Sequence, residues 1–274
     1  MPMNRAGLFI ALALSLVFVV LYLIWPEIDM RIAGVFYDAV TRTFPLRSDL
    51  IAMILRETAM IIAWAICAPA IVALVVKLAR PDKPMLLRGR TVAYMVITMV
   101  LTAGIVTNLT FKSYWGRPRP AAVVEFNGQW KFQPWWQPGG ECPRNCSFFS
   151  GEAATAFWTY APASLAPPAW RPLAYLGATV FGIATGGLRV AFGGHFVSDV
   201  VVAGLVTFVL IWLVHGFIYR WRRTRLTDEQ IEAWLTRLAW PGYMRLRRLF
   251  GLDTRPDPDK TSGFSPTKIY TGDH

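Results

Sequence analysis

The stretch GLFIALALSLVFVVLYLIW occupies residues 7–25 and contains no charged side chain. A helix over these residues is about 28 Å long at about 1.5 Å per residue, close to the thickness of the hydrocarbon core of a bilayer. No small-residue cleavage site follows, because the run ends in Trp25, Pro26 and Glu27. We therefore predict an uncleaved membrane anchor, not a signal peptide.

Five more apolar runs follow the first. We place them at residues 51–78, 91–111, 151–165, 173–190 and 197–219. The chain of 274 residues is 54% hydrophobic and only 16% charged, whereas soluble domains carry about 25% charged residues. The sequence predicts an all-α integral membrane bundle of six transmembrane helices, with residues 1–219 as the membrane domain.

Basic residues flank the apolar runs and form no separate domain, so the net charge of +11 predicts contact with the bilayer and no nucleic-acid partner. The basic residues after the second and sixth runs are Lys77, Arg80, Lys83, Arg88, Arg90, Arg220, Arg222, Arg223 and Arg225. Positive charge favours the cytoplasmic side. Six spans then place both termini in the cytoplasm, and the loops after the third and fifth runs on the outer side.

Residues 220–274 are predicted to form a basic cytoplasmic tail, partly helical and then disordered. Thr227 and Gln230 resemble a capping box that opens a helix. The apolar residues that follow at helical spacing are Ile231, Trp234, Leu235 and Leu238. Pro241 is expected to end this helix, which either lies on the inner membrane surface or packs on the protein. Polar and proline-rich composition predicts disorder beyond Asp253.

Two cysteines lie close together in a polar loop, as Cys142-Pro-Arg-Asn-Cys146. Metal binding needs further ligands, and no other Cys or His is near in sequence. A disulfide in an oxidising compartment is the better interpretation. The outer position predicted for this loop agrees with it.

The chemistry-bearing residues stand at the ends of apolar runs. Arg189, His195 and Asp199 form an R-x5-H-x3-D pattern. On a helix, His195 and Asp199 share one face, so Asp199 can accept the Nδ1–H and leave Nε2 free to attack phosphorus. A histidine that merely starts a helix, with Asp199 as its cap, is the structural alternative.

Two other segments offer groups that bind phosphate. The cations Lys112, Arg117 and Arg119 follow the third run, and such cations bind phosphate, although a snorkelling interfacial cluster has the same composition. Ser150 and Gly151 stand where a helix begins, so their amides can face an anion. Glu152 in the first turn also suits a helix N-terminus without any catalytic role.

Together these segments resemble the type 2 phosphatidic acid phosphatase (PAP2) superfamily, whose signature reads KxxxxxxRP, PSGH and SRxxxxxHxxxD. The resemblance covers residues 90–220 and implies a six-helix enzyme that needs no metal or other cofactor. It implies that His195 forms a phosphohistidine, oriented by Asp199. The residues that it implies for phosphate binding are Lys112, Arg119, Ser150, Gly151 and Arg189.

The chain departs from this signature at Phe149, Leu188 and Glu152. The last departure matters most, because the resemblance implies a histidine at position 152 that protonates the leaving oxygen. Glu152 either replaces that general acid, if burial raises its pKa, or the leaving group needs little acid. The nearby cations favour its carboxylate form.

The resemblance implies a bacterial inner-membrane phosphatase whose active site faces the periplasm and whose partners are the bilayer and a phosphorylated lipid. Lipid A, phosphatidylglycerophosphate and undecaprenyl diphosphate are the candidate substrates. Lipid-to-lipid phosphotransfer is one alternative, because an alcohol can intercept a phosphohistidine. A catalytically impaired protein that binds or transports lipids is another, because position 152 is altered.

Overall fold

The computed structural model describes residues 3–252, apart from the side chains of residues 108, 109 and 113. Within that range the regular secondary structure is helical, with only two isolated β-bridges, as the all-α prediction requires. Two compact units divide the described residues: residues up to 68 with 94–225, and residues 69–93 with those from 226 onward. The disorder predicted beyond Asp253 lies outside the described residues.

Five helices in the described range are long and apolar enough to cross a membrane. They are α1 (Arg5–Ile24), α3 (Leu50–Ala79), α4 (Gly89–Met99) continuing as the π-helix η2 (Val100–Phe111), α8 (Arg171–Ala191), and α9 (Val197–His215) continuing as η5 (Gly216–Arg220). Each begins within two residues of its predicted start. The chain is therefore a multi-pass membrane protein.

The fourth predicted span consists of two short helices, α6 (Gly151–Phe157) and α7 (Tyr160–Leu165). Pro162 explains the break, because its ring would clash with the carbonyl of Trp158, four residues earlier, in a continuous helix. The surrounding protein buries this break, since Trp158 is fully buried and Thr159 is 8% exposed. The count of six spans therefore stays a prediction.

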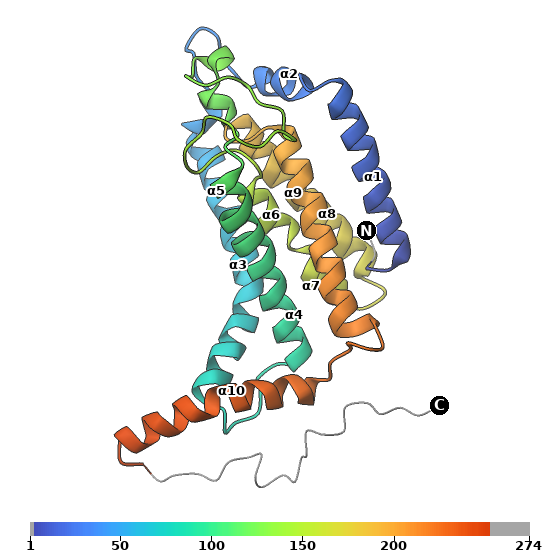
Figure 1. Cartoon of the computed structure of the whole chain (residues 1–274), viewed down its shortest axis with the longest axis vertical. Coiled ribbons are helices and arrows are strands. Elements are labelled where there is room, and N and C mark those ends of the chain that lie inside the picture. The colour runs from blue at the N-terminus through green and yellow to red at the C-terminus, as the bar shows by residue number, and fades with distance from the viewer. Residues whose placement is uncertain (1–2, 253–274) are drawn as a thin grey trace. The chain divides into compact units, whose positions relative to one another are not determined.

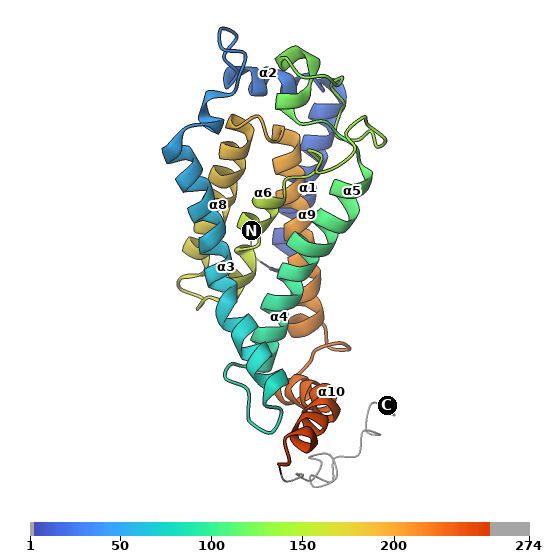
Figure 2. The same ribbon diagram turned by 90° about the vertical axis from the view of Figure 1, so that its left-hand side faces the viewer.

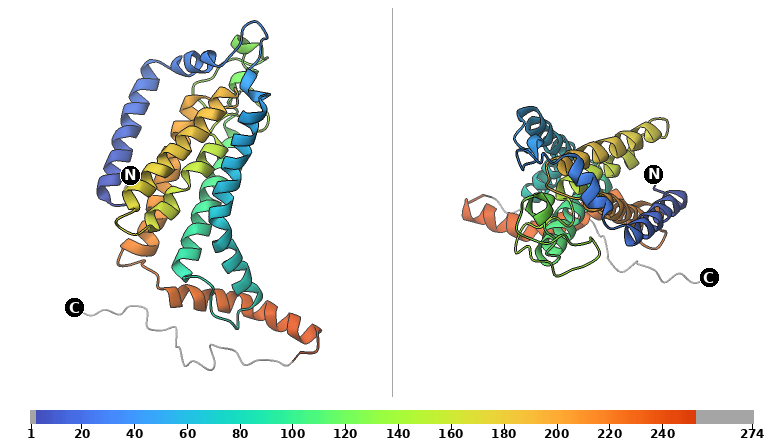
Figure 3. Two further views of the ribbon diagram at one scale, coloured as in Figure 1. Left: turned by 180° about the vertical axis from the view of Figure 1, so that it is seen from behind. Right: turned by 90° about the horizontal axis from the view of Figure 1, so that it is seen from above.

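Helix α6 forms the centre of the first unit and packs against both α8 and α9 (Figures 1 and 2). Small residues allow this close approach: Ala153, Ala154 and Ala156 are fully buried. A Cβ on Gly182 of α8 would lie 2.2 Å from the ring of Phe157, so only glycine fits there. Helix α1 stands at the edge of this bundle and contacts α9 (Figure 3).

Short elements cover the end of the first unit at which α1 ends and α9 begins. They are α2 (Ile28–Val35), η1 (Pro45–Arg47), α5 (Lys112–Tyr114), η3 (Pro120–Ala122) and η4 (Val124–Phe126). An apolar cluster joins α2, η3, η4 and the residue before η1, and it consists of Ala33, Phe44, Val123, Phe126 and Phe196, with Ala121 packed against it. Because Phe196 directly follows His195, this cluster fixes the loop that leads into α9.

The second unit is built around α10 (Asp228–Leu249), whose N-terminus carries the predicted Thr227–Gln230 capping box. Lys77 Nζ lies 3.0 Å from Glu232 Oε1, and the Arg90 amide donates to Asp228 Oδ1 at 2.8 Å. The prediction that Pro241 ends the helix is wrong, because α10 continues through it to Leu249. Proline removes one backbone donor there, and the adjacent Gly242 has no side chain to crowd the turn.

Candidate active site

His195 lies in the loop between α8 and α9 and is 2% exposed. Its Nδ1 is 2.7 Å from the carbonyl oxygen of Ser147. A carbonyl can only accept, so Nδ1 carries a hydrogen, and in the neutral ring Nε2 then carries the lone pair. Burial, opposed by Asp199, lowers the pKa of His195, which favours the neutral imidazole that can act as a nucleophile.

Asp199 lies beside His195, but it does not accept the Nδ1–H of His195 as the sequence predicted. Its Oδ2 is 3.7 Å from Nδ1, too far for a hydrogen bond, so Ser147 orients the ring directly. The Asp199 carboxylate instead accepts from Arg117, from the Ser147 hydroxyl, and from the Phe196 amide at 2.8 Å. It therefore caps α9 and supplies a negative charge near the imidazole at the same time.

Arg117 joins two buried carboxylates and is itself fully buried. It donates to Asp199, and its Nη2 donates to Asp29 Oδ2 at 2.7 Å. Asp29 also accepts the Ser198 amide at 2.9 Å. Motif spacing did not identify Asp29, since a lone acid after the first apolar run carries no pattern that predicts burial.

Four arginines line a cavity of about 390 Å³ next to His195. They are Arg47 from η1, Arg56 from α3, Arg119 from the segment before η3, and Arg189 from α8. Gly193 and Gly194 form part of its wall. A Cβ on Gly194 would lie 2.5 Å from Arg189 Nη2, so glycine lets this guanidinium lie against the backbone of the histidine loop.

Arg119 and Arg189 differ in the hydrogen bonds that their guanidinium groups make. Arg119 donates from Nε to the Asn145 carbonyl at 3.0 Å and from Nη2 to Asn145 Oδ1 at 2.6 Å. Asn145 belongs to the turn that the Cys142–Cys146 disulfide closes. Arg189 is 8% exposed, and its Nε makes no hydrogen bond among the described residues, although Glu152 Oε2 lies 3.4 Å away in an ion pair. A buried guanidinium that makes no hydrogen bond with this donor suits an anionic ligand.

Lys112, Ser150 and Gly151 meet at the N-terminus of α6. A Cβ on Gly151 would lie 3.2 Å from Lys112 Nζ, so the ammonium group rests against the glycine backbone. The Ser150 hydroxyl accepts from the Ala153 amide at 3.3 Å, as an N-cap does. Burial and the charge of Arg119 lower the pKa of Lys112. All the predicted phosphate-binding residues thus lie at one end of the first unit.

Glu152 is held by two arginines. Its carboxylate accepts from Arg56 Nε at 2.9 and 3.1 Å and from Arg56 Nη2 at 2.6 Å, and its Oε2 lies 3.4 Å from Arg189 Nε. Burial alone would raise the pKa of Glu152, but the hydrogen bond from Arg56 and the charge of Arg189 outweigh it and lower the pKa. The geometry favours an ionised group with no proton to give.

A profile of the PAP2 superfamily matches residues 91–223. A lipid A 4′-phosphatase from Francisella tularensis subsp. novicida (strain U112) is 33% identical over 202 residues, which are 73% of this chain and 90% of that protein. A lipid A 4′-phosphatase from Rhizobium leguminosarum is 34% identical over 113 residues, or 41% of this chain and 48% of that protein. No solved structure matches the chain.

Proposed function

Because this chain belongs to the PAP2 superfamily and is a phosphatase, we propose that it hydrolyses the 4′-phosphate ester of lipid A in a bacterial membrane. The name of the relative with 90% coverage supports this substrate over phosphatidylglycerophosphate and undecaprenyl diphosphate. The observation that carries the proposal is the buried imidazole of His195, held at Nδ1 by the Ser147 carbonyl, in the loop whose Gly193 and Gly194 line the cavity with four arginines.

In the proposed mechanism, Nε2 of His195 attacks phosphorus and the bond to the lipid oxygen breaks. The leaving oxygen keeps the electron pair and takes a proton from water. Lys112, Arg119 and Arg189 stabilise the charge on the phosphoryl oxygens, and the Ser150 hydroxyl and the Gly151 amide add hydrogen bonds to them. A second water then cleaves the phosphohistidine, which releases phosphate and restores His195.

The direct test is phosphate release by the detergent-solubilised protein from three lipids in parallel: lipid A, phosphatidylglycerophosphate and undecaprenyl diphosphate. We expect lipid A to be preferred, and mass spectrometry of the product to show loss of the 4′-phosphate with any 1-phosphate retained. Preference for either of the other lipids would reject the substrate, and release from none of them would reject the whole proposal.

We further propose that Glu152 acts as a carboxylate that positions Arg56 and Arg189, not as the general acid. Glu152→Gln keeps the shape of the side chain but removes its charge, so we expect kcat to fall about tenfold to a hundredfold, the range for hydrogen bonds to charged groups. The loss should be equal for substrates with good and poor leaving groups.

A general acid at position 152 would behave differently. Activity would fall as pH rises through the pKa of the acid, and Glu152→Gln would abolish that limb of the pH profile while sparing aryl phosphates, whose leaving groups need no proton. That pattern would contradict the positioning role. Unchanged turnover with every substrate would remove Glu152 from the chemistry.

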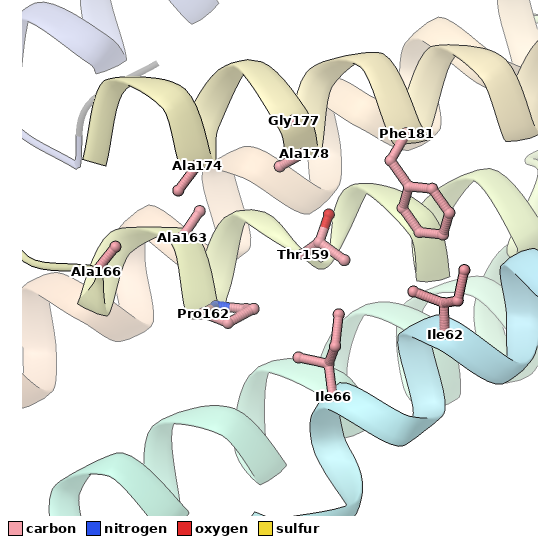
Figure 4. Close-up of a pocket in the computed structure, with 10 residues that line it drawn as sticks. All are labelled: Ile62, Ile66, Thr159, Pro162, Ala163, Ala166, Ala174, Gly177, Ala178 and Phe181. Carbon is pink, nitrogen blue, oxygen red and sulfur yellow. The ribbon is translucent and has the colours of Figure 1, made fainter. Parts of the chain in front are cut away.

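An apolar cavity of about 380 Å³ supports a lipid substrate (Figure 4). Its walls come from α3, α7 and α8, and they include Ile62, Ile66, Gly177 and Phe181. Ile62 and Ile66 follow Arg56 by six and ten residues, which is about 9 to 15 Å along the helix. We propose that an acyl chain of the substrate occupies this cavity while its phosphate binds near His195.

Filling this cavity should slow turnover of long-chain lipids only. Gly177→Leu adds a side chain where a Cβ meets nothing within 4 Å, so the fold should tolerate it. Displacing about two methylene groups of a bound chain corresponds to about a tenfold loss in kcat/KM. Gly187→Leu is the matched control, because Gly187 lies on the same helix in equally open space and does not line the cavity. An equal loss with a soluble short-chain phosphate would reject the acyl-chain site.

We propose that the active site faces the periplasm. His195 precedes the first residue of α9, whereas Arg220, Arg222 and Arg223 follow at the opposite end of the same span. Positive charge favours the cytoplasmic side of a span, which supports placing His195 on the other side. A cysteine introduced at exposed Val40 should therefore react with a membrane-impermeant thiol reagent in intact spheroplasts, and protection of that cysteine would contradict the orientation.

A further inference from the structure

Two of the four arginines that line the cavity lie outside the region matched by the superfamily profile. The profile begins at residue 91, whereas Arg47 belongs to η1 and Arg56 to α3. The family signature therefore does not account for them. Both lie in one cavity with Arg119 and Arg189, and each positive charge there needs a negative charge to balance it.

A charge balance shows that one phosphate does not use every cation of the cavity. Lys112 and the four arginines carry five positive charges. Glu152 and Glu57, which both accept hydrogen bonds from Arg56, contribute two negative charges, and a phosphate monoester carries about two at neutral pH. One positive charge is left over, and because Arg56 already has carboxylate partners, Arg47 is the cation that remains for another anion.

Arg47 has the capacity to bind a ligand. Its side chain is exposed, and no hydrogen bond or ion pair of that side chain occurs among the described residues. Burial and the charge of Arg47 together lower the pKa of Arg119, so the two guanidinium groups lie close enough to repel each other. A second anion bound at Arg47 would relieve that repulsion.

Packing fixes the position of Arg47 beside the histidine loop. Phe44, just before η1, is 5% exposed and belongs to the apolar cluster. A Cβ on Gly193 would lie 2.5 Å from the Phe44 ring, and Gly193 has a φ of +62° that favours glycine. The turn that carries Arg47 is thus anchored two residues from His195.

We propose that Arg47 forms a second anion subsite in this cavity, which binds a phosphate or carboxylate of the lipid headgroup other than the phosphate that is hydrolysed. This inference rests on the proposed function, since His195 marks where the reacting phosphate lies. Guanidinium groups suit both anions, because their planar donors match two oxygens at once. The cavity volume of about 390 Å³ is typical of pockets that hold whole small molecules, larger than one phosphoryl group requires.

The test compares two glycolipids that differ only in a second anionic group: a lipid A disaccharide with phosphates at both ends, and the same disaccharide with the 4′-phosphate alone. Arg47→Gln should lower kcat/KM for the doubly charged lipid about tenfold or more, mainly through KM, and change the singly charged lipid by about twofold or less. Arg47→Lys should recover part of the loss. Arg31→Gln is the matched control, because Arg31 is an exposed arginine on α2 outside the cavity.

The possible results separate failure of the second subsite from failure of the proposed function. An equal loss with both lipids would mean general attraction of anions and would overturn the subsite, as would no loss with either. If the unaltered protein cleaves neither lipid, the proposed function fails. If it cleaves both and Arg47→Gln makes no difference between them, only the second subsite fails.

Discussion

Replacement of His195 by alanine is expected to lower phosphate release by about 10³-fold or more, the scale seen when a nucleophile of covalent catalysis is removed. The imidazole is 2% exposed and is oriented by the Ser147 carbonyl at 2.7 Å, so no other side chain takes its place. Rapid quenching with a radiolabelled phosphate substrate should label the unaltered protein covalently, and His195→Ala should take up no label.

The pH profile gives a second measurement on the same residue. Burial lowers the pKa of His195, and the nucleophile must be neutral, so activity is lost only when the pH falls below that lowered value. The acid limb of kcat/KM should therefore lie below the ordinary histidine pKa of about 6.5.

His215→Gln serves as the control, because His215 lies at the far end of α9, where its ring contacts Tyr94 and Tyr219. It should retain activity and an unchanged pH profile. Covalent labelling of the His195→Ala protein, or turnover near that of the unaltered protein, would reject His195 as the nucleophile.

The lengths of the apolar runs predicted most of the fold, because a bilayer imposes a length on every helix that crosses it. α1, α3, α8 and α9 begin within two residues of the predicted starts. The run at residues 151–165 has the composition of a single span, but its helix is interrupted next to Pro162. Pro241, in contrast, was expected to end a helix, and α10 continues through it.

Some residues of the candidate site are predicted by the sequence, and others are found only in the structure. His195, Arg189 and Lys112 could be predicted from sequence, because each lies at or just beyond the end of an apolar run, where a membrane edge is expected. Asp29, Arg47 and Arg56 could not, since they belong to no spaced motif and reach the site only through the packing of α2, η1 and α3. Residues that are far apart in the chain and meet only in the folded protein form no spaced pattern that a single sequence can reveal.

Replacement of Arg117 by methionine is expected to destabilise the protein by about 3–5 kcal/mol, the usual cost of removing one partner from a buried ion pair. Arg117 is fully buried between Asp29, which is 1% exposed, and Asp199, which is fully buried. Without the guanidinium, two carboxylates are left uncompensated in the interior. Thermal unfolding in detergent should show the loss, and it should shrink in acid, because burial raises the pKa of Asp29 and protonation then removes its charge.

Arg119→Met separates this structural role from phosphate binding. Arg119 lies two residues away, is partly exposed, and donates only to Asn145 among the described residues, so its loss should reduce activity strongly and stability little. Adding Asp29→Asn to Arg117→Met removes one of the two unpaired charges and should restore part of the stability, which a double-mutant cycle measures. If Arg117→Met unfolds at the same temperature as the unaltered protein, or if Asp29→Asn restores nothing, then Arg117 does not hold the two carboxylates together. Asp199 would then owe its position beside His195 to its capping of α9 alone.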